Sequence, residues 1–353
     1  MNTRVQVTGR SYSANSAKLL KHLPKLMRLQ RGDVPSPVML HISPINACNL
    51  TCSFCCFANR DLSERLTFEQ VTTCVSSFAR LGISGVEFTG GGEPTLHPQI
   101  NEMIEFCHSL GLKIGICTNG VKLDKVRVWD LVSWVRIGLY GFTEGYSPDL
   151  SILRDKPVEI SAAYVFDEKT ENSTNPNILQ NWTDRSKKIP SKKFQSAAHL
   201  YQAVEWAEKN KIPTRIAFNA IRESHHVLSD IEEIRRRLAE FDLKNGPRHY
   251  AFLSDFNYKP TRRNNNCYMH LVKPCLFTDG NVYVCPSAEL SPENKYNVNE
   301  QFKVCEWNTV DETYTKLPTG GLTRDHDCSF CKYAMQNEII DDVLMETKHN
   351  EFA

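Results

Sequence analysis

Three cysteines stand within eight residues of one another, at the spacing C-x3-C-x2-C. They are Cys48, Cys52 and Cys55, and they follow a short apolar segment, 37–42, that is typical of a β-strand. Three thiolates in one loop can hold three corners of a cubane iron–sulfur cluster, whose full ligation by protein requires four. One iron then stays open, much as a catalytic zinc ion keeps one position free of protein ligands. The spacing therefore predicts an iron–sulfur site with an open coordination position.

At these residues the chain resembles the radical S-adenosylmethionine (SAM) superfamily, whose signature loop reads C-x3-C-x-aromatic-C, with Phe54 here at the aromatic position. The resemblance implies that the open iron of a [4Fe-4S] cluster binds the amino and carboxylate groups of SAM. It also implies that SAM is cleaved to methionine and a 5'-deoxyadenosyl radical, which abstracts a hydrogen atom from an organic substrate. The electron would come from a donor such as flavodoxin or ferredoxin.

Apolar periodicity predicts that strands and helices alternate along the chain after this loop. Strands are expected at 85–88, 113–117, 134–139, 158–166 and 214–218, and helices at 67–80, 99–110, 124–132, 197–209 and 229–241. Such alternation indicates parallel βα units. Six units match the family's core, an α/β fold that forms a partial (β/α)6 TIM-like barrel with its active site at the carboxyl ends of the strands. The polar stretch 167–193 is expected to be a mobile lid or disordered.

A glycine-rich motif follows the second expected strand. Gly91, Gly92 and Glu93 resemble the family motif whose backbone binds the SAM amino group, and Pro94 fixes the turn. Glycine suits this role because it lets the backbone approach a ligand closely. The alternative is an ordinary turn between a strand and a helix.

Polar residues also follow the third and sixth expected strands. Thr118 and Asn119 resemble another recurrent family sequence, in which the asparagine lies near the ribose or the substrate, although a plain Asn-Gly turn would look the same. Asn219 is a further candidate for the cofactor pocket, or else an exposed loop residue. At the fourth strand Gly138 replaces a serine that many family members place near the ribose, so Arg136 or Tyr140 is expected to compensate or to contact the substrate. The pattern identifies no catalytic side chain.

Cysteines return in the last third of the chain. The segment from Cys275 to Cys285 alternates around Asp-Gly-Asn, which predicts a β-hairpin, and Cys328 and Cys331 form a chelating C-x2-C pair. Four thiolates from these elements predict either a zinc site or a second iron–sulfur cluster.

The same region resembles the SPASM and twitch extensions of radical SAM enzymes, because Cys267, Gly280 and Cys285 fit the spacing C-x(9–15)-G-x4-C. The resemblance implies one auxiliary cluster, for electron transfer or structure, in a small cysteine-rich domain. Its expected ligands are Cys275, Cys285, Cys328 and Cys331, with Cys267 as a substitute.

Three domains are therefore expected: a helical lead-in at 1–35, the radical SAM core at 36–247, and the auxiliary-cluster domain at 248–353. The basic segment 1–32 also overlaps in composition with a mitochondrial transit peptide, but two short helices packed on the core fit it better. Lys and Arg number 42 against 41 Asp and Glu, so no global charge favours nucleic acid. No apolar run is long enough to span a membrane, and 13 clustered cysteines without a secretory signal favour metal binding in a reducing cytoplasm.

The leading hypothesis is a radical SAM enzyme of oxidoreductase or epimerase type that modifies a small metabolite or a natural-product precursor. Modification of a ribosomally made peptide is an alternative, disfavoured because 1–36 is too short for a separate peptide-recognition domain. An alternative of another class is a non-catalytic iron–sulfur or zinc redox sensor, against which Glu93 after paired glycines argues, because a sensor needs no SAM pocket.

Overall fold

A ten-stranded sheet organises the protein. A computed structural model describes residues 17–52, 54–55, 57, 60–167, 197–218, 224–253, 266–286, 302–317, 322–323 and 333–345. Within these residues the strand order is β11-β10-β9-β1-β2-β3-β4-β5-β6-β7. The run from β1 to β7 is parallel throughout. Its strands are β1 (Met39–Ile42), β2 (Gly85–Phe88), β3 (Lys113–Thr118), β4 (Trp134–Gly138), β5 (Glu159–Phe166), β6 (Thr214–Phe218) and β7 (Ala251–Leu253).

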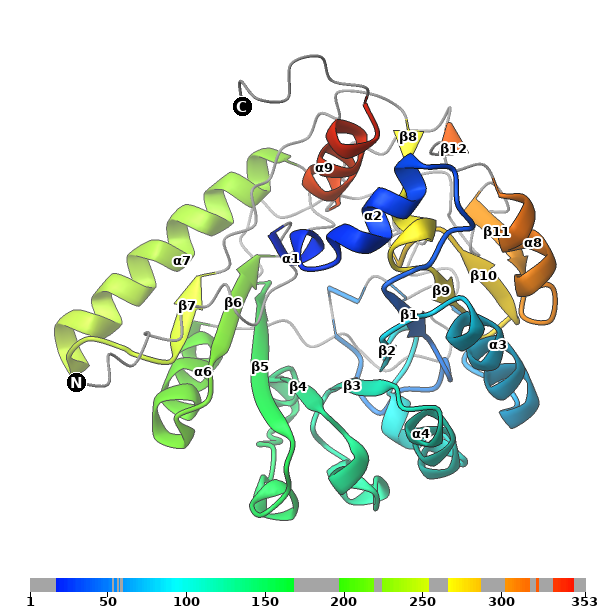
Figure 1. Ribbon diagram of the computed structural model, residues 1–353. Coiled ribbons are helices and arrows are strands. Elements are labelled where there is room, and N and C mark those ends of the chain that lie inside the picture. The colour runs from blue at the N-terminus through cyan, green and yellow to red at the C-terminus, as the bar shows by residue number, and fades with distance from the viewer. Residues whose placement is uncertain are drawn as a thin grey trace, which may run out of the picture.

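Helices cover the outside of the curved sheet (Figure 1). The apolar core lies between the two layers, where alternate strand residues such as Val86 and Phe88 pack with helix residues such as Phe78 and Ile104. This alternation confirms the α/β fold and the parallel βα units expected from the sequence. The helices of this outer layer are α3 (Phe68–Arg80), α4 (Ile100–Ser109), α6 (Ala197–Asn210) and α7 (Ser224–Asn245).

The helix expected at 124–132 is wrong. Two short 3-10 turns stand there, η3 (Leu123–Lys125) and η4 (Trp129–Leu131). The Asn101 side chain donates to the Lys125 carbonyl at 3.0 Å and accepts from the Arg127 N–H at 2.7 Å. It thereby satisfies backbone groups that a continuous helix would have paired internally.

The C-terminal segment extends the same sheet on the far side of β1. Strand β9 (Cys275–Leu276) lies parallel to β1, with Cys275 opposite His41. The expected hairpin is confirmed, because β9 pairs in antiparallel fashion with β10 (Asn281–Tyr283), which in turn pairs with β11 (Lys303–Glu306). The predicted boundary at residue 248 thus falls within one continuous sheet, and the three-domain division stays a prediction.

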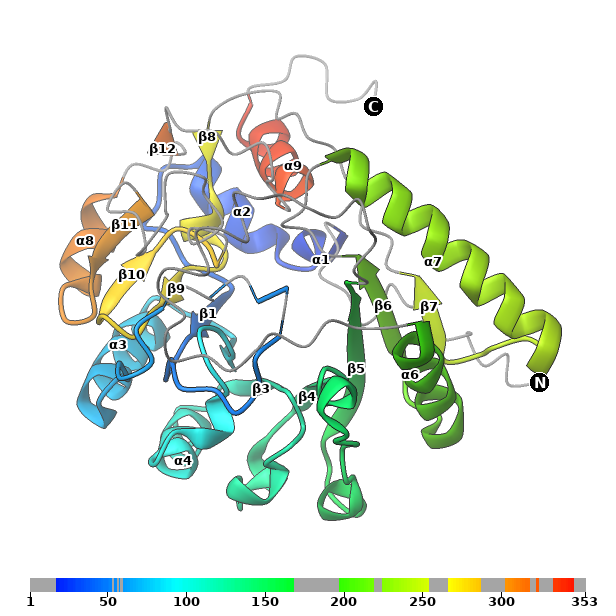
Figure 2. The same ribbon diagram turned by 180° about the vertical axis from the view of Figure 1, so that it is seen from behind.

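The two ends of the described chain pack together in a second core. Helices α1 (Ala17–Leu20) and α2 (Leu23–Gln30) lie beside α9 (Ala334–Leu344) in both views (Figures 1 and 2), and Leu26 and Ile340 are among the buried residues they share. The remaining elements are β8 (Asn266–Cys267), which pairs with β12 (Leu322–Thr323), and α8 (Val310–Lys316). Within the described part of the chain, no helix is both long enough and apolar enough to cross a bilayer.

Candidate active site at the carboxyl ends of the strands

The three-cysteine loop follows the carboxyl end of β1. Cys48, Cys52 and Cys55 are half-buried thiols outside any disulfide. Burial raises the pKa of Cys48 to about 11. It also raises the pKa of Cys52 well above its usual range, with further contributions from Cys55 and Cys48. Because each thiolate would disfavour the others, the three together suit a site that a metal cluster neutralises.

Hydrogen-bond donors point at the sulfur atoms of this loop. The Leu50 N–H lies 3.5 Å from Cys48 Sγ, and the Asn119 amide nitrogen lies 3.9 Å from the same atom. The Arg60 guanidinium donates to Cys55 Sγ at 3.4 Å and to the Asn46 carbonyl at 2.6 Å. Such donors are among the features by which proteins tune iron–sulfur clusters.

The loop does not resemble a site for a single ion. Among the residues that the structure describes, no three His, Cys, Asp or Glu side chains gather tightly enough to enclose one metal ion. A cluster presents a separate iron to each cysteine, so its ligands need not converge on one point. The donor set of the loop therefore fits a cluster.

The glycine motif packs directly against the cysteine loop. A Cβ atom on Gly91 would lie 2.1 Å from Asn46 Oδ1, and one on Gly92 would lie 2.1 Å from the Ala47 carbonyl oxygen. The Gly92 and Glu93 N–H groups donate to loop carbonyls at 2.8 and 2.9 Å. Glycine is thus required because the backbone of the motif lies against the segment that enters the loop.

Glu93 joins the two motifs that the sequence analysis treated separately. Its buried carboxylate accepts from the Thr95 N–H at 3.1 Å, the Thr95 hydroxyl at 2.8 Å, the Thr118 hydroxyl at 2.7 Å and the Asn119 N–H at 2.7 Å. Burial raises the pKa of Glu93, and these hydrogen bonds oppose the rise. The Asn119 side chain donates to Asn49 Oδ1 at 2.7 Å. Glu93 therefore fixes the turn after β3 relative to the cysteine loop.

An aromatic pair connects β4 to the cysteine loop. The rings of Phe54 and Tyr140 meet edge to face, with 5.0 Å between their centroids. A Cβ atom on Gly138 would lie 2.4 Å from the Tyr140 ring. Glycine suits this position because the ring occupies the space that a side chain would take. No local sequence pattern indicates this pairing.

The C-terminal cysteines are described only in part. Cys275 is buried in β9, Cys285 follows β10, and Cys267 lies in β8. Burial raises the pKa of Tyr333, and both Cys285 and Cys275 add to the rise, so the two cysteines share one neighbourhood. The other predicted residues, Cys328, Cys331 and Asn219, lie outside the described residues.

Apart from Arg136, the charged side chains on the inner face of the sheet were not predicted from the sequence. Glu87 on β2 accepts from Lys273 Nζ at 2.5 Å and from Cys117 Sγ at 3.2 Å, and His41 Nδ1 lies 3.4 Å from it. Arg136 on β4 donates to Cys117 Sγ at 3.0 Å. A detectable signal was present, since His41, Glu87 and Arg136 each stand between two apolar residues of their strand.

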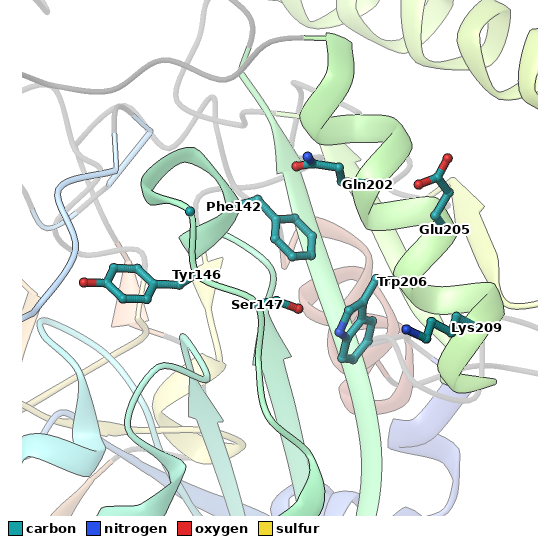
Figure 3. A pocket seen from close by; sticks show the side chains of 8 residues that line it. Phe142, Tyr146, Ser147, Gln202, Glu205, Trp206 and Lys209 are labelled. Carbon is teal, nitrogen blue, oxygen red and sulfur yellow. The ribbon is translucent and has the colours of Figure 1, made fainter.

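A hollow of about 350 Å³ lies elsewhere, on the outer layer of the fold. Figure 3 shows Phe142, in the segment after β4, facing Gln202 and Trp206 of α6. Within the described connection from β4 to β5, the helical part consists of the short 3-10 turns η5 (Gly141–Glu144) and η6 (Ser151–Leu153). The hollow contains none of the thiols and none of the strand-end motifs.

Comparison with known proteins identifies the domain that carries the cysteine loop. Residues 42–152 match the model of the radical SAM superfamily. The chain carries a radical SAM domain. This confirms the resemblance seen in the sequence, and the cofactors of the domain are accordingly a [4Fe-4S] cluster and SAM.

Curated relatives match over about a quarter of the chain. An S-adenosylmethionine-dependent nucleotide dehydratase of Flammeovirga pacifica is 33% identical over 101 residues, which are 26% of this chain and 34% of that protein. A GTP 3',8-cyclase of Xanthomonas axonopodis pv. citri is 34% identical over 98 residues, which are 25% of this chain and 29% of that protein. The matches thus span about a third of the length of these relatives.

Solved structures share the fold over most of the chain. The crystal structure of Streptococcus suis SuiB bound to S-adenosylmethionine superposes with a TM-score of 0.55 at 16% identity, over 87% of this chain and 73% of SuiB. A second SuiB structure gives a TM-score of 0.53 at 18% identity over the same shares of the two chains. The shared fold therefore extends well beyond residues 42–152.

Proposed function

We propose that the protein is a radical SAM enzyme whose [4Fe-4S] cluster is held by Cys48, Cys52 and Cys55. One observation supports this proposal most strongly. The loop holds three thiols, hydrogen-bond donors contact two of their sulfur atoms, and a glycine turn packs against the loop. When bound, the cluster and SAM supply the 5'-deoxyadenosyl radical that removes a hydrogen atom from the substrate.

The surrounding residues hold the site in place. Arg60 and Asn119 donate to the sulfur atoms and fix the conformation of the loop. Gly91 and Gly92 let the backbone that is to bind the SAM amino group pack against the stem of the cysteine loop. Glu93 fixes the neighbouring turn that carries Asn119. These contacts preorganise the site before any substrate arrives.

We assign Cys275, Cys285, Cys328 and Cys331 to an auxiliary [4Fe-4S] cluster, with Cys267 as a substitute ligand. The hairpin supports this assignment, because it holds Cys275 beside β1 and brings Cys285 to the neighbourhood of the same tyrosine. An all-cysteine cluster has no open iron, so its role is electron transfer or structure. A zinc ion on the same thiolates is the alternative, and metal analysis distinguishes the two.

The proposed reaction is the oxidation, epimerisation or related modification of a small organic molecule. The names of the curated relatives support a small molecule over a peptide, since one relative is a nucleotide dehydratase and another a GTP cyclase. The proposal includes a one-electron donor such as flavodoxin or ferredoxin and a reducing cytoplasm, in which clustered thiols persist.

SAM cleavage tests the proposal directly. The anaerobically reconstituted protein is reduced with dithionite in the presence of SAM, and 5'-deoxyadenosine and methionine are quantified by liquid chromatography and mass spectrometry. We expect both products from the native protein and from Cys107→Ala, which alters a buried core cysteine of α4. Cys52→Ala should yield neither product. Equal cleavage by Cys52→Ala would refute the assignment of the loop.

A further inference from the structure

The inner face of the parallel sheet carries charge where a barrel normally carries apolar side chains. Leu40, Ile42, Val86, Phe88, Val135 and Ile137 all belong to the core shared with the helices. Since side chains alternate along a strand, the residues between them face the inside of the curve. These inner-face residues include one polar or charged side chain from each of five strands: His41, Glu87, Cys117, Arg136 and Arg215.

Closed barrels fill this space with bulky branched side chains in layers. Here β5 contributes the small residues Ser161 and Ala163 to the inner face, and β6 contributes Ala217 beside Arg215. Arg136, Arg215 and Cys117 are only half-buried. The inner face is therefore built to contact a polar molecule.

Cations outnumber carboxylates on this face. The inner-face residues named above and Lys273, which contacts Glu87, form one cluster of polar side chains. Among its described members, Arg136, Arg215 and Lys273 are cationic, whereas Glu87 is the one carboxylate. Lys273 contacts that carboxylate directly, at 2.5 Å. The described residues of this cluster therefore carry more positive than negative charge.

The Arg136 guanidinium has more N–H donors than the contacts described here use. It donates a hydrogen bond to Cys117 Sγ at 3.0 Å and lies over the Trp134 ring, 5.4 Å from the ring centroid. A guanidinium has five N–H donors in a planar fork. Within the described residues, no Asp or Glu oxygen lies within 4.0 Å of this fork.

Arg215 lies close enough to Arg136 for the two charges to interact. Ala163 pairs with Gly138 on one side and with Arg215 on the other, so Arg215 stands one inner-face position nearer the carboxyl edge than Arg136. Burial and, to a smaller extent, the charge of Arg136 lower the pKa of Arg215 to about 10. Like charges in a poorly hydrated space repel strongly, and an anion between them relieves this repulsion.

Tyr140 connects this pair to the cysteine loop. Its ring contacts Phe54 of the loop at 5.0 Å. Burial raises the pKa of Tyr140, whereas Arg136 and Arg215 oppose the rise, so both cations lie near its hydroxyl. A group bound by the two arginines would therefore be separated from the cysteine loop only by the Tyr140 side chain.

We propose that Arg136 and Arg215 bind an oxyanionic group of the substrate, a phosphate or a carboxylate, on the inner face beside the cysteine loop. The inference rests on the proposed function, because it treats the inner face as the substrate site of that enzyme. Guanidinium groups suit the role, since their planar forks bind phosphate and carboxylate with two parallel hydrogen bonds. The anchored group would fix which carbon of the substrate faces the radical.

Calorimetric titration tests the site without any turnover. Pyrophosphate and malonate are titrated separately into the reconstituted, SAM-loaded protein and into Arg136→Gln, Arg215→Gln and the control Arg236→Gln. Arg236 is an exposed cation on α7 that pairs with Glu233. We expect at least one probe to bind, with a Kd raised at least about tenfold by either inner-face variant and changed less than about twofold by the control.

The two probes separate the two sources of the anion. Tighter binding of pyrophosphate assigns a phosphorylated substrate, and tighter binding of malonate assigns a carboxylate. Failure of both probes to bind, or equal binding by Arg136→Gln and Arg215→Gln, would overturn the site. Arg136→Lys keeps the charge but loses the planar fork, so it should also weaken binding; circular dichroism and thermal unfolding of each variant verify folding.

SAM cleavage by the same samples separates this inference from the proposed function. If 5'-deoxyadenosine forms but neither probe binds, the anion site is refuted while the radical SAM assignment stands. If a probe binds in an arginine-dependent way but no 5'-deoxyadenosine forms, the anion site stands and the enzymatic proposal fails.

Discussion

Replacing Glu93 with glutamine tests how the two strand-end turns are held together. Both carboxylate oxygens accept a backbone N–H, one from Thr95 at 3.1 Å and one from Asn119 at 2.7 Å. A glutamine has one acceptor oxygen and one NH2 group, so either orientation turns a donor towards a backbone N–H. The hydroxyls of Thr95 and Thr118 can rotate to accept, but a backbone N–H cannot.

One buried backbone donor therefore loses its acceptor in Glu93→Gln. Such a loss costs about 1–3 kcal/mol of unfolding free energy. With an unfolding entropy of about 2.1 cal/mol/K per residue, this corresponds to a fall in Tm of about 1–4 °C for a chain of 353 residues. Urea denaturation and scanning calorimetry measure the two quantities. Glu105→Gln, on the exposed face of α4, is the matched control and should change stability by less than about 0.5 kcal/mol. Equal stability of the two variants would refute the proposed role of Glu93.

The same variant makes a pH prediction with a definite sign. The folded-state pKa of Glu93 is raised by burial, so its contribution to stability is present below its unfolded pKa of about 4.3 and is lost as the pH rises through the folded value. Glutamine does not titrate. The stability difference between the native protein and Glu93→Gln should therefore be larger at about pH 4.5 than at about pH 8. A difference that grows with pH would contradict this account of the carboxyl.

Two further substitutions test contacts that local sequence patterns do not reveal. Gly138→Ala places a methyl group 2.4 Å from the Tyr140 ring, so we expect the ring to leave Phe54, stability to fall by about 1–3 kcal/mol and SAM to bind more weakly by calorimetry. Unchanged stability and SAM affinity would show that the ring is not held there. Lys273→Met leaves the Glu87 carboxylate buried without its ammonium partner and should cost about 3–5 kcal/mol in urea denaturation. The double variant with Glu87→Gln should recover part of that loss, and simple additivity would contradict the pairing.

Much of the fold and of the cysteine loop could be predicted because the relevant signals are local. The spacing of Cys48, Cys52 and Cys55 lies within eight residues, and the apolar periods of strands and helices repeat over short windows. The glycines of the motif after β2 were predictable for the same reason. Their physical cause, a backbone in contact with the stem of the loop, became visible only in the structure.

Contacts between distant segments could not be predicted in this way. Lys273 pairs with Glu87 across 186 positions of sequence, and no local period brings them together. The prediction of a helix after β3 was wrong for a similar reason. Asn101, on the separate helix α4, forms hydrogen bonds with the backbone of that segment. Arg136 could be recognised as a charge between two apolar neighbours, but only the shared sheet shows that it faces the same space as Arg215.

The central claim is that the loop of Cys48, Cys52 and Cys55 holds the cluster of a radical SAM enzyme, and an iron count tests it most directly. Iron, sulfide and zinc are measured per chain in the anaerobically reconstituted protein and in a variant with all three cysteines replaced by alanine. We predict that about eight irons fall to about four, or that about four fall to none if the C-terminal thiolates hold zinc. An iron and sulfide content that the triple substitution leaves unchanged would contradict the account.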